Sequence, residues 1–151
     1  MKYLILLLVL FCSCSKDIEP NKVYINRYLS TSLINSAGQD LFLSNDYNVN
    51  NIKISFLKQG VEQEVENEVN LNYITQMSPS YLRIPLNFDQ YEDLPITYIK
   101  WNSVDTDTVI VSYKKVEGSN NFYEDFDKVW YNGRLLPSTE YGGGKTITIL
   151  K

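Results

Sequence analysis

Five acidic residues are the side chains of this chain that could do chemistry if folding brought them together. Asp105 and Asp107 open one strand-like segment, and Glu124, Asp125 and Asp127 lie in the next. If the two segments pair, these carboxylates could form a weak calcium site, because calcium takes roughly six to eight oxygen ligands. Two carboxylates about 5 to 9.5 Å apart could also hydrolyse a glycoside. No glycine stands where a calcium loop needs its sharp turn, so we interpret the five residues as solvated strand ends.

The composition removes most other catalytic classes. Histidine is absent, and both cysteines, Cys12 and Cys14, stand near the N-terminus. Serine–histidine, cysteine–histidine and zinc-hydrolase mechanisms are therefore excluded. Gly142–Thr146 does not make a phosphate loop, because Thr139 stands where its first glycine is required and a strand follows instead of a helix. We assign no catalytic residue and no cofactor, and we expect a protein that is not an enzyme.

The charge of the chain argues against two classes of partner. The formal net charge is −4, and loss of Lys2 with the N-terminal segment would make the remainder one unit more negative. Nucleic acids and anionic lipid headgroups are bound by basic stripes, which this chain lacks. We therefore expect neither as a partner.

In the segment Val61–Val69, glutamate alternates with valine, glutamine or asparagine. Its four glutamates, which occupy every second position from Glu62 to Glu68, would share one face of a strand. Such a face could bind a cation or a basic partner. We favour an edge strand whose charges face water and discourage pairing with other chains, with Lys53 or Lys58 across a hairpin offsetting the repulsion.

Aromatic residues are abundant. The chain has 12 tyrosines, one of them Tyr3 near the start, together with Trp101 and Trp130. Flat rings beside amides and carboxylates suit sugar faces, and they equally suit protein interfaces. Strands favour tyrosine in any case, and both tryptophans lie in patterned segments where burial is expected. Carbohydrate binding by exposed tyrosines is therefore an alternative to a structural role.

Alternation with a period of two recurs along the chain and predicts half-buried strands. We expect strands at Val23–Leu33, Leu41–Leu43, Ile52–Phe56, Val61–Val69, Leu82–Phe88, Ile96–Trp101, Thr106–Val116, Phe122–Tyr131, Arg134–Leu136 and Thr146–Leu150. Pro85 lacks an amide hydrogen, so its strand should lie at a sheet edge or carry a bulge. Turn residues separate these segments, among them Gln59–Gly60 and the hairpin pair Asn132–Gly133.

These strands predict an all-β fold: a single antiparallel β-sandwich, immunoglobulin-like or transthyretin-like with Greek-key connections. A closed sheet is the alternative architecture. The chain after the N-terminal segment is long enough for one domain with one core.

The N-terminal segment is typical of an export signal. Lys2 supplies the positive charge, and the apolar stretch Tyr3–Phe11 is far shorter than the roughly 20 residues of a membrane span. With its four lipobox positions at Phe11, Cys12, Ser13 and Cys14, the segment resembles bacterial lipoprotein signals cleaved by signal peptidase II. The resemblance implies cleavage before Cys14 and several acyl chains, palmitate among them, on that residue. An ordinary cleaved signal that leaves a soluble periplasmic domain is the alternative.

We therefore divide the chain into a removed signal peptide (1–13), a lipidated cysteine with a short tether (14–22) and a sandwich domain (23–151). The acidic stretch Ser15–Glu19 resembles the surface-export signal of Bacteroidota lipoproteins, which implies exposure at the cell surface. The stretches SAGQDLFL, IKISFLKQG, VDTDTVIVSYKK and FDKVWYNGRLL resemble small Bacteroidota lipoproteins of unassigned function. That resemblance implies a sandwich fold and no catalytic residues.

Together these features lead us to expect a lipid-anchored outer-membrane or cell-surface lipoprotein. Its expected role is a non-catalytic binding or accessory module of an envelope assembly, with the membrane and envelope proteins as partners. A carbohydrate-binding lipoprotein of a glycan-uptake system is the alternative, and a hydrolase that uses carboxylates alone is a weaker one.

Overall fold

The computed structural model describes most of the expected domain. The described residues are 24–65, 73–74, 79–88, 93–117, 122–137, 139–141 and 144–151. The expected signal peptide and Cys14 lie outside them, as do Glu66, Glu68 and the Gly142–Gly143 pair. None of the helices in the described part of the chain has the length and hydropathy that crossing a membrane requires.

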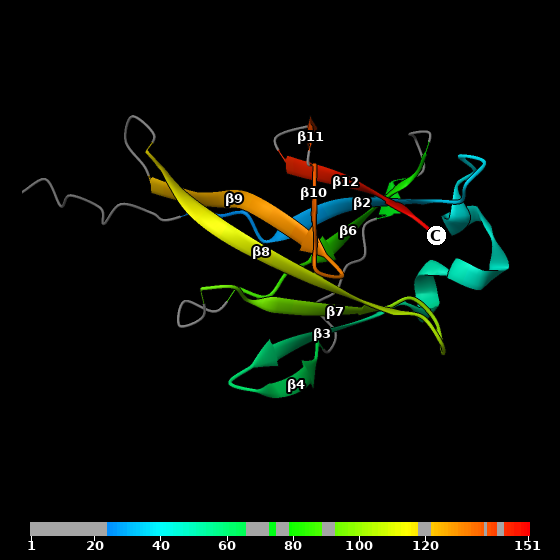
Figure 1. Cartoon of the computed structure of the whole chain (residues 1–151), viewed down its shortest axis with the longest axis horizontal. Helices are drawn as coiled ribbons and strands as arrows, with labels where there is room; N and C mark the ends of the chain where they lie inside the picture. Colours follow the sequence, from blue (N-terminus) through cyan, green and yellow to red (C-terminus); the bar gives the residue numbers. More distant parts are fainter. Residues whose placement is uncertain are drawn as a thin grey trace, which may run out of the picture.

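The strands form two sheets, which confirms the all-β sandwich (Figure 1). In spatial order the larger sheet contains β1 (Tyr24–Ile25), β9 (Phe122–Tyr131), β8 (Thr106–Glu117), β7 (Ile96–Lys100), β3 (Lys53–Lys58) and β4 (Val61–Glu64), and β10 (Arg134–Leu136) also pairs with β9. The smaller sheet contains β11 (Thr139–Tyr141), β12 (Gly144–Leu150), β2 (Tyr28–Ile34), β6 (Tyr81–Pro85) and β5 (Tyr73–Ile74).

Most neighbouring strands are antiparallel, but two pairs are parallel: β1 with β9 and β12 with β2. The chain crosses between the sheets after β1, β2, β4, β6 and β10. Parallel neighbours need a long connection, and here most of the domain separates the members of each pair. The expectation of a purely antiparallel sandwich is corrected to this extent.

The core lies between the two sheets and takes alternate residues from each. In the smaller sheet it includes Leu29, Leu33, Leu82, Ile84, Ile147 and Ile149. In the larger sheet it includes Ile54, Ile99, Val109, Val111, Phe126 and Val129. Trp101, which directly follows β7, is completely buried in the same cluster. The period-two pattern therefore correctly indicated which faces of these strands are buried.

Two hairpins close with the turn chemistry that the sequence predicts. Gln59 and Gly60 have φ values of 52° and 78°, and Asn132 and Gly133 have φ values of 47° and 77°. Positive φ at both central residues is the signature of a type I′ turn, whose twist matches that of the paired strands. The first turn joins β3 to β4, and the second joins β9 to β10.

The prediction of a strand at Leu41–Leu43 is wrong. This segment is the first of three short 3₁₀ helices, which continue at Asn45–Tyr47 and Val49–Asn51. The carboxylate of Asp40 accepts a hydrogen bond from the backbone N–H of Phe42, and this local bond favours a helical turn over a sheet ladder. Only the middle residue of the three is buried, so the segment still contributes Phe42 to the core.

The expected long strand Val23–Leu33 is divided at residues 26 and 27. Its first part pairs with β9 in the larger sheet, and its second part is β2 of the smaller sheet. Pro85 ends β6, which lies between β2 and β5, so this strand is not an edge strand as a whole. Because β5 pairs only with Tyr81 and Leu82, Pro85 lies beyond its reach and faces no described strand on that side.

Candidate functional site

The five acidic residues named from the sequence do not come together. In the β8–β9 ladder Asp125 lies opposite Lys114 and Glu124 lies opposite Lys115, whereas Asp107 lies at the other end of β8. Asp125 instead accepts a hydrogen bond from the side-chain amide of Asn26 at 3.2 Å. Among the described side chains no group of three acidic, histidine or cysteine residues could hold a metal ion. The conditional convergence of these residues therefore does not occur between Asp107 and Asp125, and the interpretation as solvated strand ends does not hold for Asp107, which is buried. The side chain of Glu124 lies outside the described residues.

Asp107 is the centre of a buried polar network. Its side chain is 4% exposed and accepts hydrogen bonds from Asn132 Nδ2 at 2.6 Å, from Trp101 Nε1 at 2.5 Å and from the hydroxyl of Tyr131. Lys151 Nζ forms an ion pair with the same carboxylate. Four donors thus surround one carboxylate, which ties β7, β8, the β9–β10 hairpin and Lys151 together.

Lys151 extends this network to a second carboxylate. Its ammonium also contacts Asp105 Oδ1 at 2.7 Å, and the other oxygen of Asp105 accepts a hydrogen bond from the Tyr47 hydroxyl at 3.0 Å. The backbone N–H of Lys151 donates to Ile34 O at the end of β2. The network therefore joins both sheets and the 3₁₀ segment at one end of the sandwich.

The protonation equilibria of this network follow from its geometry. Burial alone would raise the pKa of Asp107, but the hydrogen bonds from Lys151, Tyr131, Asn132 and Trp101 stabilise the carboxylate and lower its pKa below the ordinary value. Burial and the adjacent Asp107 raise the pKa of Tyr131. Burial and the hydrogen bond to Asp105 raise the pKa of Tyr47 to about 12. A carboxylate with four donors and a lowered pKa is unsuited to act as a general acid, so we interpret this network as structural.

The glutamate segment forms an edge strand over its described part, as expected. β4 is the last strand of the larger sheet, and all four of its residues are exposed. Glu64 forms an ion pair with Lys53 at 2.8 Å, and Glu62 accepts a hydrogen bond from the hydroxyl of Ser55 at 2.5 Å. Because both members of the ion pair are more than half exposed, it contributes at most about 1 kcal/mol.

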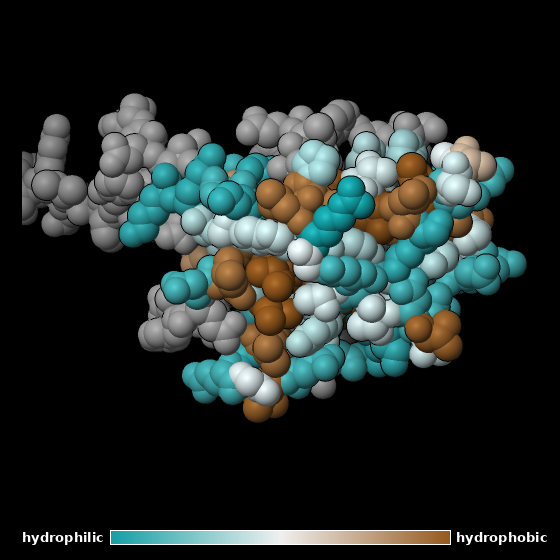
Figure 2. Space-filling view, viewed as in Figure 1, coloured by the Kyte–Doolittle hydropathy of each residue, from teal (hydrophilic) through white to brown (hydrophobic). Residues whose placement is uncertain are grey.

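An apolar row crosses the open face of the larger sheet, opposite the core. The register places five apolar side chains side by side on β3, β7, β8, β9 and β10: Leu57, Ile96, Ile110, Trp130 and Leu135. We call these five residues the apolar row. Figure 2 shows the corresponding brown band across β8, β7 and β3. With strands about 4.8 Å apart, the row is about 19 Å long.

Polar side chains border the apolar row on both sides. Ser55, Tyr98 and Thr108 form the next row in one direction, and Ser112 and Lys128 pair in the other. Along each strand of such an antiparallel sheet, apolar residues that face the core ordinarily alternate with polar residues that face the open side. An uninterrupted apolar row with a polar border is instead typical of an interaction surface.

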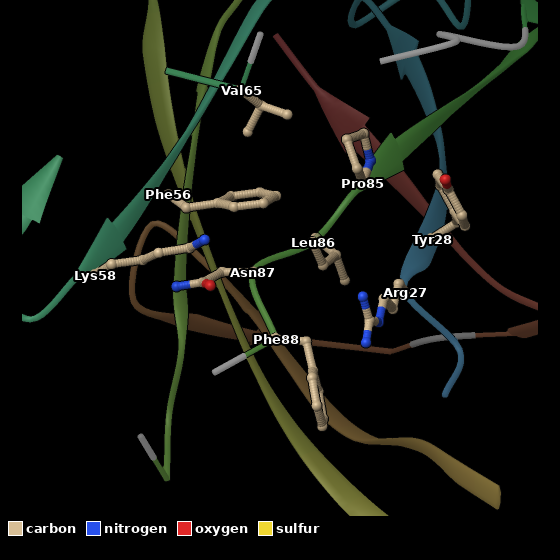
Figure 3. A pocket seen from close by; sticks show the side chains of 9 residues that line it. All are labelled: Arg27, Tyr28, Phe56, Lys58, Val65, Pro85, Leu86, Asn87 and Phe88. Atoms are coloured by element: carbon tan, nitrogen blue, oxygen red, sulfur yellow. The ribbon is translucent and has the colours of Figure 1, made fainter. Parts of the chain in front are cut away.

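A hollow of about 170 Å³ lies between β3 and the smaller sheet, on the face of β3 that points away from the apolar row. Its wall contains two cations and three aromatic rings: Arg27, Lys58, Tyr28, Phe56 and Phe88. Figure 3 shows Phe56, Lys58 and Asn87 on one side and Arg27 and Tyr28 on the other. The guanidinium of Arg27 lies 5.2 Å from the centre of the Phe88 ring, and Lys58 Nζ lies 5.7 Å from that of Phe56.

Asn87 is a buried polar residue in the wall of this hollow. Its side-chain N–H groups donate to Leu57 O at 2.8 Å and to Ile96 O at 3.2 Å, and its backbone N–H donates to Thr97 Oγ1 at 2.8 Å. The side-chain oxygen, however, is buried and has no hydrogen-bond partner. An unmet buried acceptor costs about 1–3 kcal/mol, so a donor that reached this oxygen would be favourable.

The tyrosines whose side chains the structure describes do not form an exposed platform. Among them only Tyr28, at 40%, belongs to the exposed large hydrophobic residues. Trp101 is buried, as its position in a patterned segment predicts, whereas Trp130 is half-buried in the apolar row. Neither the apolar row nor the hollow was predicted from the sequence, because each depends on the register or approach of separate strands.

Comparisons of the chain with protein-family models, with curated proteins and with solved structures found no match.

Proposed function

We propose that this protein is a lipoprotein of the bacterial cell envelope, anchored to the outer membrane through acyl chains on Cys14. Its sandwich domain is a non-catalytic module that binds another envelope protein, at the cell surface if the acidic stretch after Cys14 acts as an export signal. The N-terminal signal and its resemblance to lipobox sequences support the anchor. Several acyl chains make such an anchor durable, since one chain alone binds only marginally.

The apolar row is the observation that carries the binding role. Four of its side chains are half-buried, and Leu135 is 53% exposed. A standard interface takes about 800 Å² from each partner, and a row about 19 Å long supplies the centre of a surface of that size. Large apolar and aromatic side chains at the centre of a patch, with polar ones around it, match the anatomy of such interfaces.

The charges around the row indicate the partner's chemistry. Lys100 and Lys128 are exposed on the open side of the sheet. Neither forms an ion pair with a described carboxylate, whereas Lys53 on the same side is already paired with Glu64. Glu62, which the register places opposite Leu57, adds a negative charge at the β4 end of the row. The row therefore suits a protein surface with an apolar centre, carboxylates opposite Lys100 and Lys128, and a cation opposite Glu62.

A charged substitution in the row tests this proposal. Ile110→Lys places an ammonium at the centre of the row, which should weaken binding by about 2 kcal/mol or more, or about 30-fold. The matched control is Val104→Lys, because Val104 is 92% exposed and lies in the loop before β8.

The assay is the mass of the full-length protein after mild detergent extraction of membranes, with circular dichroism to verify folding. Wild type and Val104→Lys should elute in the same complex, which contains a second protein, and Ile110→Lys should elute alone. The proposal would be contradicted if Ile110→Lys stayed in the complex. It would also be contradicted if the wild type were monomeric, or bound only to further copies of itself.

A glycan-binding lipoprotein is the second candidate. The observation that favours it is the hollow, where three aromatic rings lie beside two cations. Aromatic faces with adjacent polar groups are suited to a sugar ring, which presents apolar faces and hydroxyl groups.

A further inference from the structure

The hollow between β3 and the smaller sheet contains two cations held in place by aromatic rings. Arg27 is positioned by the Phe88 ring and by its own carbonyl oxygen, which accepts a hydrogen bond from Leu86 N at 2.8 Å. Lys58 is positioned by the Phe56 ring. Their placement over rings favours these positions without neutralising the charges.

No anion among the described residues neutralises either of these two cations. Within the described residues Lys151 and Lys53 form ion pairs with carboxylates, and Lys145 donates to the carbonyl oxygen of Phe126. Neither Arg27 nor Lys58 has a described carboxylate within ion-pair distance. Two unpaired positive charges on one concave wall form a site for an anionic group.

Asn87 adds a requirement for a donor. Its Oδ1 is buried at the wall of the hollow without a hydrogen-bond partner. Its backbone and side-chain N–H groups, by contrast, donate three hydrogen bonds, two to backbone carbonyl oxygens and one to a threonine hydroxyl. Because that oxygen is buried, a ligand reaches it only when side chains that line the hollow move. A hydroxyl group of a ligand would then satisfy it.

The size of the hollow limits the ligand to a single compact unit. Its volume of about 170 Å³ is below the roughly 300–1,000 Å³ of pockets for drug-sized molecules. The lining is complementary to a small molecule that has an anionic group, a hydroxyl donor and a flat or apolar face. Sugar acids and sugar phosphates combine these three properties.

We propose that this hollow binds one anionic saccharide unit, with Arg27 and Lys58 on its carboxylate or phosphate and Phe56 and Phe88 against its ring. The inference deepens the second candidate function and does not depend on the apolar row. A unit of about 13 non-hydrogen atoms at ordinary ligand efficiency binds with a dissociation constant on the order of 1 mM.

The test is a nuclear magnetic resonance titration of the full-length protein in a neutral detergent. The probes are glucuronate and glucose 6-phosphate, with glucose, acetate and inorganic phosphate as partial probes. Shifts are followed at the Arg27 side chain and at the Asn87 backbone and side-chain amides. We expect saturable shifts with at least one of the two anionic sugars, and which of them binds more tightly distinguishes a carboxylate ligand from a phosphate ligand.

Substitutions make the assignment specific. Arg27→Gln and Lys58→Gln should each weaken binding about 10-fold or more. The matched control is Arg83→Gln, because Arg83 also lies over an aromatic ring, 4.9 Å from the centre of Tyr28, but outside the lining of the hollow. It should bind as the wild type does.

Three results would overturn the proposal: no saturation with either anionic sugar at tens of millimolar, equal shifts with acetate or phosphate alone, or equal losses in all three variants. Loss of partner binding by Ile110→Lys with unchanged sugar binding would show that the two surfaces are separate. Failure of the sugar titration would therefore leave the protein-binding role to be judged by its own experiment.

Discussion

Replacing Asp107 with asparagine should destabilise the fold by about 3 kcal/mol without changing its shape. The aspartate and asparagine side chains are nearly isosteric, so the substitution removes charge and acceptor capacity rather than volume. The buried carboxylate now receives hydrogen bonds from Trp101, Tyr131 and Asn132 and pairs with Lys151. An amide offers one oxygen and would turn its own N–H groups toward one of these donors.

The magnitude follows from the burial and from the remaining partners. Removing one member of a buried ion pair costs about 3–5 kcal/mol. We expect the lower end, because Lys151 is 17% exposed and keeps its contact with Asp105 at 2.7 Å. Small domains have free energies of unfolding of about 5–15 kcal/mol, so the variant should still fold.

Urea unfolding measures this effect with a reporter inside the network. The fluorescence of Trp101, whose indole N–H donates to Asp107, should report the transition together with that of Trp130. For a slope of about 1.5 kcal/mol per molar urea, the midpoint should fall by about 2 M. Asp127→Asn is the control, because Asp127 is exposed, and its midpoint should change by the equivalent of less than about 0.5 kcal/mol.

The pH dependence gives the prediction its sharpest check. The pKa of Asp107 is lowered in the folded state, so its contribution to stability is present above the unfolded value of about 3.9 and is lost as the pH falls through the lower folded value. The difference in unfolding free energy between wild type and Asp107→Asn should therefore be constant near neutrality and shrink below about pH 4. A difference that stays constant in acid, or that equals the effect of Asp127→Asn, would refute the reasoning.

Three further predictions concern other parts of the chain. Burial and then Asp107 raise the pKa of Tyr131, and burial and Asp105 raise that of Tyr47 to about 12. The two hydroxyl groups therefore stabilise the fold below the ordinary tyrosine pKa of about 10, and this stabilisation is lost as the pH rises above that value. The free energy of unfolding of Tyr131→Phe should fall less between pH 8 and 11 than that of the wild type. Equal losses in urea unfolding would contradict this prediction. Gly133→Ala should lower the melting temperature by about 2–4 °C. The φ angle of Gly133 is 77° and an added Cβ would meet no atom within 4 Å, so the cost comes from the backbone conformation alone. An unchanged melting temperature would count against the turn assignment. Cys14→Ala should abolish incorporation of labelled fatty acid while leaving the melting curve unchanged, and continued labelling would show that the anchor assignment is wrong.

The strands and turns could be predicted because their signals are local. Phe122–Tyr131 and Arg134–Leu136 have the predicted bounds, and the Asn132–Gly133 turn between them has the predicted positive φ values. Alternation fixes the buried face of a strand, and an Asn-Gly pair fixes the turn. Neither signal requires knowledge of distant residues.

The errors arise where local hydrogen bonds compete with pattern. Leu41–Leu43 has the apolar composition of a strand. The carboxylate of Asp40, however, accepts hydrogen bonds from the backbone N–H groups of Phe42 and Ser80, and these bonds favour a turn. The division of Val23–Leu33 between two sheets likewise depends on partners that are distant in sequence, since Tyr24 pairs with Tyr123 and Ser30 with Thr146.

The candidate sites depend on register and could not be read from the sequence. The apolar row exists because Leu57, Ile96, Ile110, Trp130 and Leu135 meet at one level of five strands, and a shift of one residue in any ladder would break it. The same register separates Asp107 from Asp125, which the sequence left free to converge. The sequence singled out Asp107 and Trp101 separately, but it did not indicate that Asp107 contacts Trp101, Tyr131, Asn132 and Lys151.

Site-specific photo-crosslinking in living cells tests the central claim most directly. A photoreactive residue at Tyr98, which borders the apolar row on the open face, should give one discrete adduct with another envelope protein. The same residue at Thr148, which is exposed on the smaller sheet, should give none. The account would be contradicted by equal adducts at both positions, or by no adduct at Tyr98.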